Sequence, residues 1–152
     1  MVYKILLILS TATLGVFLGT QLSEAALIVP YWKSLTANDF FEFYRVNGQK
    51  LHQFYAPLTI ASTILPILTL AFSMFGKSKI DLRLWLMTVF SILFFSSFFV
   101  YFKDANLSFA QRTITNEALP LELIKWGQWH WGRVVCETVA FICGLFLLLK
   151  SK

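Results

Sequence analysis

Charged residues are scarce in this sequence. Only 14% of its 152 residues are Asp, Glu, Lys or Arg, whereas 57% are hydrophobic, and the mean hydropathy is +0.67. A soluble domain usually carries about 25% charged residues, so this composition excludes an ordinary soluble protein. We predict an integral membrane protein that forms one domain over residues 1–152, with the lipid bilayer as its surroundings.

Cysteine and histidine are also rare. The two cysteines, Cys136 and Cys143, lie about 10 Å apart along one predicted helix, so they cannot bridge each other and are expected to be buried thiols. The sequence contains no nucleotide-binding loop, nucleic-acid-binding module, soluble catalytic triad or H-E-x-x-H motif. These absences exclude nucleic acid as a partner, in spite of the net charge of +5.

Long apolar runs, in contrast, are abundant. Four of them predict membrane spans at about residues 5–29, 53–75, 82–102 and 126–149, each near the roughly 20 residues that cross the hydrocarbon core. The fold class is therefore predicted to be all-α, a four-helix transmembrane bundle. The first run resembles a secretory signal near Ala25, but its apolar pattern continues to Val29, so we expect it to be retained as the first span.

A short helix is predicted in the connection after the first span. Thr36 to Asp39 offer N-cap residues for a helix through Arg45, and its aromatic side chains suit the headgroup layer. The long connection over residues 103–125 is expected on the same outer side, with a helix beginning near Pro120.

The distribution of charge predicts the orientation. The excess of basic residues falls at one end of the bundle, where Asp81 is the only acidic residue and the basic residues are Lys4, Lys77, Lys79, Arg83, Lys150 and Lys152. By the positive-inside rule, both termini are predicted to be cytoplasmic, and the inner (cytoplasmic) membrane is the expected location.

Ionisable residues inside the apolar runs gather in the outer half. His130, Arg133 and Glu137 fall on one face of the fourth predicted helix, with Glu137 about 10 Å deeper than His130. Glu24 ends the first span, and His52 begins the second. We predict that His52 and His130 point into one shared cavity and that Glu24 lies close to Arg133, because an isolated charge at this depth costs several kcal/mol.

This convergence favours a membrane oxidoreductase with a site for a hydrophobic small molecule. His52, His130 and Glu137 are the candidate catalytic residues, and Arg133 would orient an anionic substrate. His52, His130, Glu24 and Glu137 together have the chemistry of a site for iron, copper or another metal, and the two imidazoles alone could hold a haem.

A structural alternative stays open. Arg133 could pair with Glu24 or Glu137 only to hold helices in register, each histidine could bond a loop carbonyl, and the tryptophans could form an interfacial belt. The alternative function is a non-catalytic subunit or small-molecule binder in a homo-oligomer or larger membrane complex.

The motifs resemble the anthrone oxygenase-like family of small four-helix membrane proteins. The shared features are Pro30 after the first span, Asn47 before the second, and a Trp-x-x-Trp-Asn-x-x-Arg pattern opening the fourth, which reads Trp126-Gly-Gln-Trp-His-Trp-Gly-Arg133 here. The resemblance implies oxygen-dependent oxidation of a hydrophobic, often polyketide-derived, aromatic, with Asn47, Trp129 and Arg133 as substrate-binding residues. Two histidines depart from the family pattern: His130 replaces the motif Asn, and His52 occupies a position that is often Asn.

Overall fold

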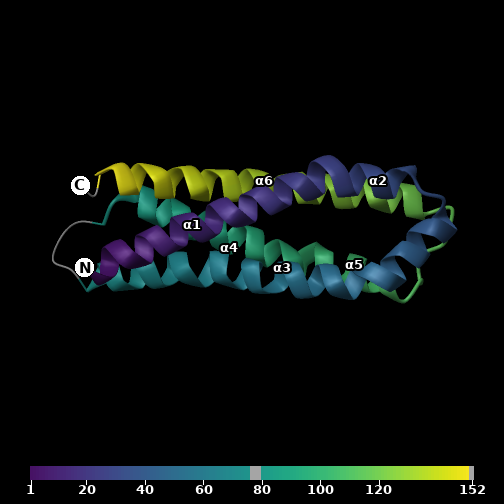
Figure 1. The fold of residues 1–152 in the computed structure, drawn as a ribbon, viewed down its shortest axis with the longest axis horizontal. Helices are drawn as coiled ribbons and strands as arrows, with labels where there is room; N and C mark the ends of the chain where they lie inside the picture. The colour runs from purple at the N-terminus through teal and green to yellow at the C-terminus, as the bar shows by residue number, and fades with distance from the viewer. Residues whose placement is uncertain (76–79, 151–152) are drawn as a thin grey trace.

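The computed structural model of the chain describes residues 1–75 and 80–150. Over these residues every regular element is helical (Figure 1). In chain order they are α1 (Val2–Ser23), the π-helical turn η1 (Glu24–Ile28), α2 (Val29–Ser34), α3 (Ala37–Met74), α4 (Leu82–Ser97), the π-helical turn η2 (Phe98–Phe102), α5 (Lys103–Ala110) and α6 (Leu119–Lys150).

These elements combine into four long helices that confirm the all-α membrane bundle. The stretches Val2–Ser34, Ala37–Met74, Leu82–Ala110 and Leu119–Lys150 are each long and apolar enough to cross a membrane. Helices α1 and α4 each pack against both α3 and α6, which closes the bundle. Both termini lie at one end, called the proximal end here, and the α2–α3 and α5–α6 connections lie at the distal end (Figure 1).

The predicted interfacial helix is not a separate element. Thr36 is the N-cap as expected, with its Oγ1 accepting a hydrogen bond from the Asp39 N–H at 3.3 Å. The helix that begins there continues to Met74 and contains both Pro57 and Pro66. Prolines are tolerated in membrane helices, because neighbouring groups satisfy the backbone groups that they free. In the same way, the helix expected near Pro120 is the start of α6.

The helices are longer than a bilayer requires. A hydrocarbon core of about 30 Å needs roughly 20 residues, whereas α3 has 38. Its four charged residues, Asp39, Glu42, Arg45 and Lys50, all precede His52. We therefore place the distal edge of the hydrocarbon near His52 on α3, so the distal ends of the helices extend into the headgroup layer.

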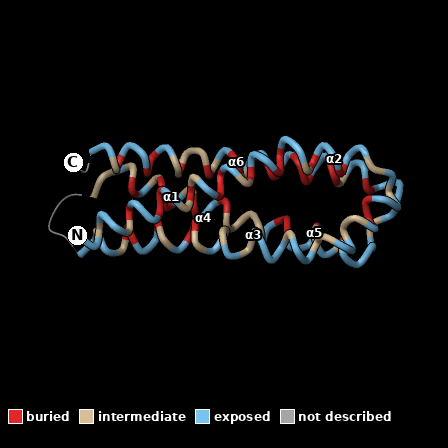
Figure 2. The backbone as a smooth tube through the Cα atoms, in the orientation of Figure 1, coloured by how far each residue is buried: buried red, intermediate tan, exposed pale blue. Residues whose placement is uncertain are grey.

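Buried residues occur along the length of the bundle (Figure 2), and they form chemically different clusters toward its two ends. The proximal cluster is mainly aliphatic and sulfur-containing: Leu7, Leu14, Leu70, Leu84, Met87, Ala140, Cys143 and Leu147. Here α1 and α6 approach so closely that a Cβ at Gly144 would lie 2.6 Å from Thr11 Oγ1. The distal cluster is mainly aromatic: Val29, Trp32, Phe40, Phe41, Tyr101, Phe102, Ala105, Phe109, Leu119, Leu123 and Trp126.

Candidate functional site

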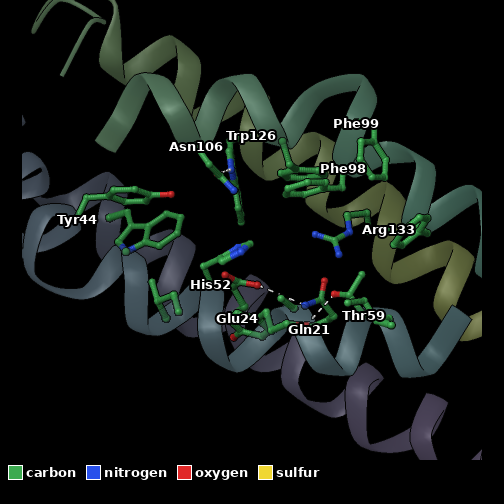
Figure 3. A pocket seen from close by; sticks show the side chains of 18 residues that line it. Gln21, Glu24, Tyr44, His52, Thr59, Phe98, Phe99, Asn106, Trp126 and Arg133 are labelled. Carbon is green, nitrogen blue, oxygen red and sulfur yellow. Dashed lines mark hydrogen bonds between the residues drawn. The ribbon is translucent and has the colours of Figure 1, made fainter. Parts of the chain in front are cut away.

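A cavity of about 300 Å³ lies in the distal half of the bundle (Figure 3). Most of its wall is apolar, and four phenylalanines at helical spacing, Phe95, Phe98, Phe99 and Phe102, form one side. The polar lining side chains that bear on its chemistry are Gln21, Glu24, His52, Thr59, Asn106 and Arg133. An apolar wall with a few convergent polar groups is typical of a small-molecule site.

Two π-helical turns shape this cavity. In η1 the Val29 N–H bonds the carbonyl of Glu24, and in η2 the Lys103 N–H bonds the carbonyl of Phe98. Each wide turn shifts the phase of the residues around it, so that Glu24 and the η2 phenylalanines line the cavity. Single π-helical turns are frequent at functional sites, and both such turns found over residues 1–75 and 80–150 border this one.

Glu24 and His130 form a buried pair. The His130 ring is fully buried and stacks on Trp126, with centroids 5.0 Å apart. Its Nε2 lies 3.0 Å from the carbonyl oxygen of Gln21, and its Nδ1 lies 3.8 Å from Glu24 Oε2. Because Nε2 must donate to a carbonyl, a neutral ring presents a bare Nδ1 to the carboxyl group. At 3.8 Å this contact is longer than a hydrogen bond. The hydrogen bond that Glu24 Oε2 accepts comes from Gln21 Nε2 at 3.5 Å.

Arg133 supplies the positive charge of the cavity. Its guanidinium projects into the space (Figure 3) and lies 4.8 Å from the centroid of the Phe102 ring. Among the described residues, no carboxylate lies within 4.0 Å of it, and its buried Nε has no hydrogen-bond partner. The sequence predicts that Glu24 and Arg133 lie close enough to pair, directly or through water. Both residues line the same cavity, without a direct ion pair between them.

Glu137 lies one turn deeper than Arg133 on α6. Its side chain is fully buried, and neither carboxylate oxygen has a hydrogen-bond partner within the described part of the chain. It does not line the cavity. Glu137 therefore has no contact with the cavity that would support the catalytic role predicted for it.

The cavity reaches the surface on one side of the bundle. Three of its lining residues are exposed: His52 and Ile60 on α3 and Phe99 in η2. These residues place the opening between α3 and the α4–η2 helix, at the predicted level of the distal hydrocarbon edge. An apolar molecule dissolved in the bilayer can reach this opening without crossing water.

The structure separates several of the predicted site residues. His52 lines the mouth of the cavity, whereas His130 lies behind its wall, so the prediction that both histidines point into it is wrong. Asn47 also lies outside the lining, and its Nδ2 donates to the carbonyl of Phe43 at 3.0 Å. Trp129 stacks on Tyr101 at 5.2 Å, and is 38% exposed on another face.

The donor set does not fit a resident metal or haem. Across residues 1–75 and 80–150, no group of three or more His, Cys, Asp or Glu side chains is placed to hold a metal ion. His130 is engaged with Gln21 and Glu24, while His52 is exposed at the mouth. The four predicted ligands, His52, His130, Glu24 and Glu137, are therefore not brought together around one position.

Other lining residues were not singled out from the sequence. Asn106 lies in the distal helix α5, where its Oδ1 accepts a hydrogen bond from Trp126 Nε1 at 3.0 Å. Tyr44, Tyr55 and Thr59 lie along α3. Among the cavity residues that were not predicted, the four phenylalanines could most readily have been found from the sequence. Their i, i+3, i+4, i+7 spacing places them on one face of a helix.

Comparison with protein-family models, with curated proteins and with solved structures finds no significant match to this chain. The resemblance to the anthrone oxygenase-like family therefore stays a prediction that rests on the sequence motifs alone. Function has to be argued from the cavity and the residues that line it.

Proposed function

We propose that this membrane protein binds a small amphipathic molecule with an aromatic or otherwise apolar body and an anionic oxygen group. Arg133 carries the proposal, because its guanidinium lines the cavity and forms no ion pair or hydrogen bond with a described residue. An unpaired cation in a largely apolar space is costly. A carboxylate or phenolate of the ligand supplies the charge-assisted hydrogen bonds that Arg133 lacks.

The rest of the lining fits the body of such a molecule. The phenylalanine face offers flat apolar surfaces, and Asn106 and Thr59 provide polar contacts at its edges. The cavity volume of about 300 Å³ is at the lower end of the usual range for ligand sites, about 300–1,000 Å³. This size favours a compact ligand, such as a two-ring aromatic acid, over a large cofactor.

The experiment compares two arginines that both stack on phenylalanine. Arg133 contacts Phe102, whereas Arg112 lies 5.0 Å from Phe41 on the exposed distal surface. The protein is placed in phosphatidylcholine nanodiscs, and binding of 1-hydroxy-2-naphthoate is followed by energy transfer from tryptophan. Its uncharged methyl ester is the matched probe.

Arg133→Gln should weaken binding of the acid by roughly 10- to 100-fold, since a hydrogen bond to a charged group contributes about 1.5–3 kcal/mol. The same variant should leave binding of the ester unchanged, and Arg112→Gln should affect neither probe. Equal binding of acid and ester by the parent protein, or equal losses in both variants, would contradict the proposal.

A second candidate function is oxidation of a hydroxyaromatic molecule by dioxygen, as the family resemblance implies. The Glu24–His130 pair favours it, because the pair borders the cavity and is suited to take a proton. Arg133 would stabilise the resulting oxyanion, which is the electron-rich form that reacts with oxygen.

Oxygen uptake with anthrone as the probe tests this candidate. We expect uptake with the parent protein and its loss in Glu24→Gln, with Glu42→Gln as the control because Glu42 pairs with Arg45 on the exposed surface. Binding of the naphthoate probe without oxygen uptake would support ligand binding as the function and would contradict the proposed oxidation.

For the cellular setting, we propose the inner (cytoplasmic) membrane with both termini in the cytoplasm. The charge asymmetry between the two ends of the bundle supports this orientation. The cavity would then open toward the outer leaflet. Assembly into a homo-oligomer or a larger membrane complex stays a prediction from the phenylalanine-rich third span.

A further inference from the structure

A second hollow, of about 380 Å³, lies on the outside of the bundle between α4 and α6. We call it the α4–α6 groove. Its wall includes Leu93, Phe94 and Ser97 from α4, and Gln128, Trp129 and Arg133 from α6. Arg133 is the one residue that it shares with the cavity described above.

The groove changes in polarity along the membrane normal. Because α4 and α6 are antiparallel, Ser97 and Gln128 lie toward the distal end and Leu93 and Cys136 toward the proximal end. Leu93 and Trp129 are 50% and 38% exposed on the membrane-facing surface. A polar distal end above an apolar proximal end matches a lipid that stands in the distal leaflet.

Arg133 also gives the groove a positive charge. Its Cζ lies 6.0 Å from the Phe94 ring, which lines the groove, and 4.8 Å from the Phe102 ring nearer the headgroups. Helical side chains lean toward the N-terminus of their helix, and for α6 this direction is distal. The guanidinium projects into the cavity (Figure 3), and as the one residue common to both linings Arg133 places its positive charge between the cavity and the groove.

We propose that the α4–α6 groove binds one anionic phospholipid of the distal leaflet. The phosphate lies between Gln128 and Arg133, since the Ser97 hydroxyl already donates to the carbonyl of Phe94. An acyl chain follows Leu93 toward Cys136. A second copy of this chain fits less well, because the only carboxyl group within Leu82–Phe102 and Trp126–Leu149 is that of Glu137, which is fully buried. Self-association through this face thus supplies no anion for Arg133.

The test uses Trp129 as a reporter within the groove. The protein is placed in phosphatidylcholine bilayers that contain a low, equal mole fraction of either dibrominated phosphatidylglycerol or dibrominated phosphatidylcholine. The Trp129 signal is the fluorescence difference between the parent protein and Trp129→Phe. Trp131, which is 50% exposed but does not line the groove, provides the matched difference signal.

We expect severalfold stronger quenching of Trp129 by the brominated phosphatidylglycerol, and equal quenching of Trp131 by the two lipids. Gly132 also lines the groove, so Gly132→Leu should fill it and abolish the preference, whereas Gly19→Leu should not. Both glycines are suitable, because a Cβ at either position meets no heavy atom within 4 Å. Arg133→Gln should also abolish the preference, and Arg133→Lys should retain part of it.

Equal quenching of Trp129 by the two lipids would overturn the proposal, as would a preference that survives Gly132→Leu. Displacement by millimolar inorganic phosphate would show a site for a free anion and would also overturn it. If self-association closes the groove, neither brominated lipid should quench Trp129, and this result would also overturn the proposal. Because Arg133 borders both hollows, Gly132→Leu is the variant that separates them: it fills the groove alone, while the naphthoate probe in pure phosphatidylcholine measures cavity binding without an anionic lipid.

Discussion

Glu24 and His130 meet inside the bundle, with His130 Nδ1 3.8 Å from Glu24 Oε2, although the first lies near the end of the first span and the second near the start of the last. Only Glu24 reaches the cavity. The imidazole behind it is anchored to the Gln21 carbonyl and stacked on Trp126. His130 therefore packs behind Glu24 and not in the cavity, and the two histidines of the chain lie in different environments.

The first prediction concerns these two histidines. His130→Ala should lower the free energy of unfolding by about 2–5 kcal/mol, because it leaves a cavity and an unpaired Gln21 carbonyl. His52→Ala should change it by about 0.5 kcal/mol or less, since this side chain is exposed. Unfolding of the purified protein in mixed detergent micelles measures both. Similar losses in the two variants would show that His52 also has a buried partner.

The sequence predicted the helices well because length and hydropathy are local properties. It also placed Glu24, His52, His130 and Arg133 in the same half of the bundle. It did not give the rotation of each helix about its axis, which depends on packing against its neighbours. His52 therefore lies exposed at the mouth, while Tyr55, three residues further along α3, lines the cavity.

The contact between Glu24 and His130 was not predicted, for a related reason. The prediction of a Glu24–Arg133 pair assumed a regular helical repeat, but Glu24 begins the π-helical turn η1. A π-helical turn inserts an extra residue and shifts the phase of the residues around it. This shift accompanies the approach of Glu24 to His130, while the buried Nε of Arg133 has no hydrogen-bond partner among the described residues.

The second prediction concerns orientation. Asn116 and Lys4 are exposed at opposite ends of the bundle, so a cysteine at each position reports the two sides of the membrane. Cys136 and Cys143 are first replaced by serine. In right-side-out vesicles, a membrane-impermeant maleimide should label Asn116→Cys at once and Lys4→Cys only after permeabilisation. The reverse pattern would place both termini outside.

The third prediction concerns Asp81 at the proximal end. Asp81 caps α4 by accepting hydrogen bonds from Arg83 through its Nε at 2.9 Å and its backbone N–H at 3.0 Å, and Lys150 Nζ lies 3.0 Å away. Arg83 first and then Lys150 hold the pKa of Asp81 well below its usual value. Asp81 thus links the start of α4 to the end of α6.

A lowered pKa fixes the direction of the pH effect. The contribution of Asp81 to stability is fully present above the unfolded pKa of about 3.9, and it is lost as the pH falls further toward the folded value. Asp81→Ala should cost about 0.5–2 kcal/mol at neutral pH, as expected for an N-cap. The difference from the parent should shrink in acid, whereas Asp104→Ala on the exposed face of α5 should show little difference at any pH. A difference that grows in acid would contradict the assignment.

The last prediction concerns Glu137, whose two carboxylate oxygens are fully buried without a hydrogen-bond partner among the described residues. Glu137→Met keeps the length of the side chain and removes both oxygens, so it should raise the free energy of unfolding by about 1–3 kcal/mol. Glu122→Met is the matched control, because Glu122 accepts a hydrogen bond from the Tyr101 hydroxyl at 2.6 Å and should lose stability on the same change. Opposite signs in the two variants would identify Glu137 as a destabilising residue, which is the kind that proteins retain at functional sites. A loss of stability in Glu137→Met would instead mean that the carboxyl group has a partner in the membrane, and the interpretation of Glu137 as a destabilising residue would fail.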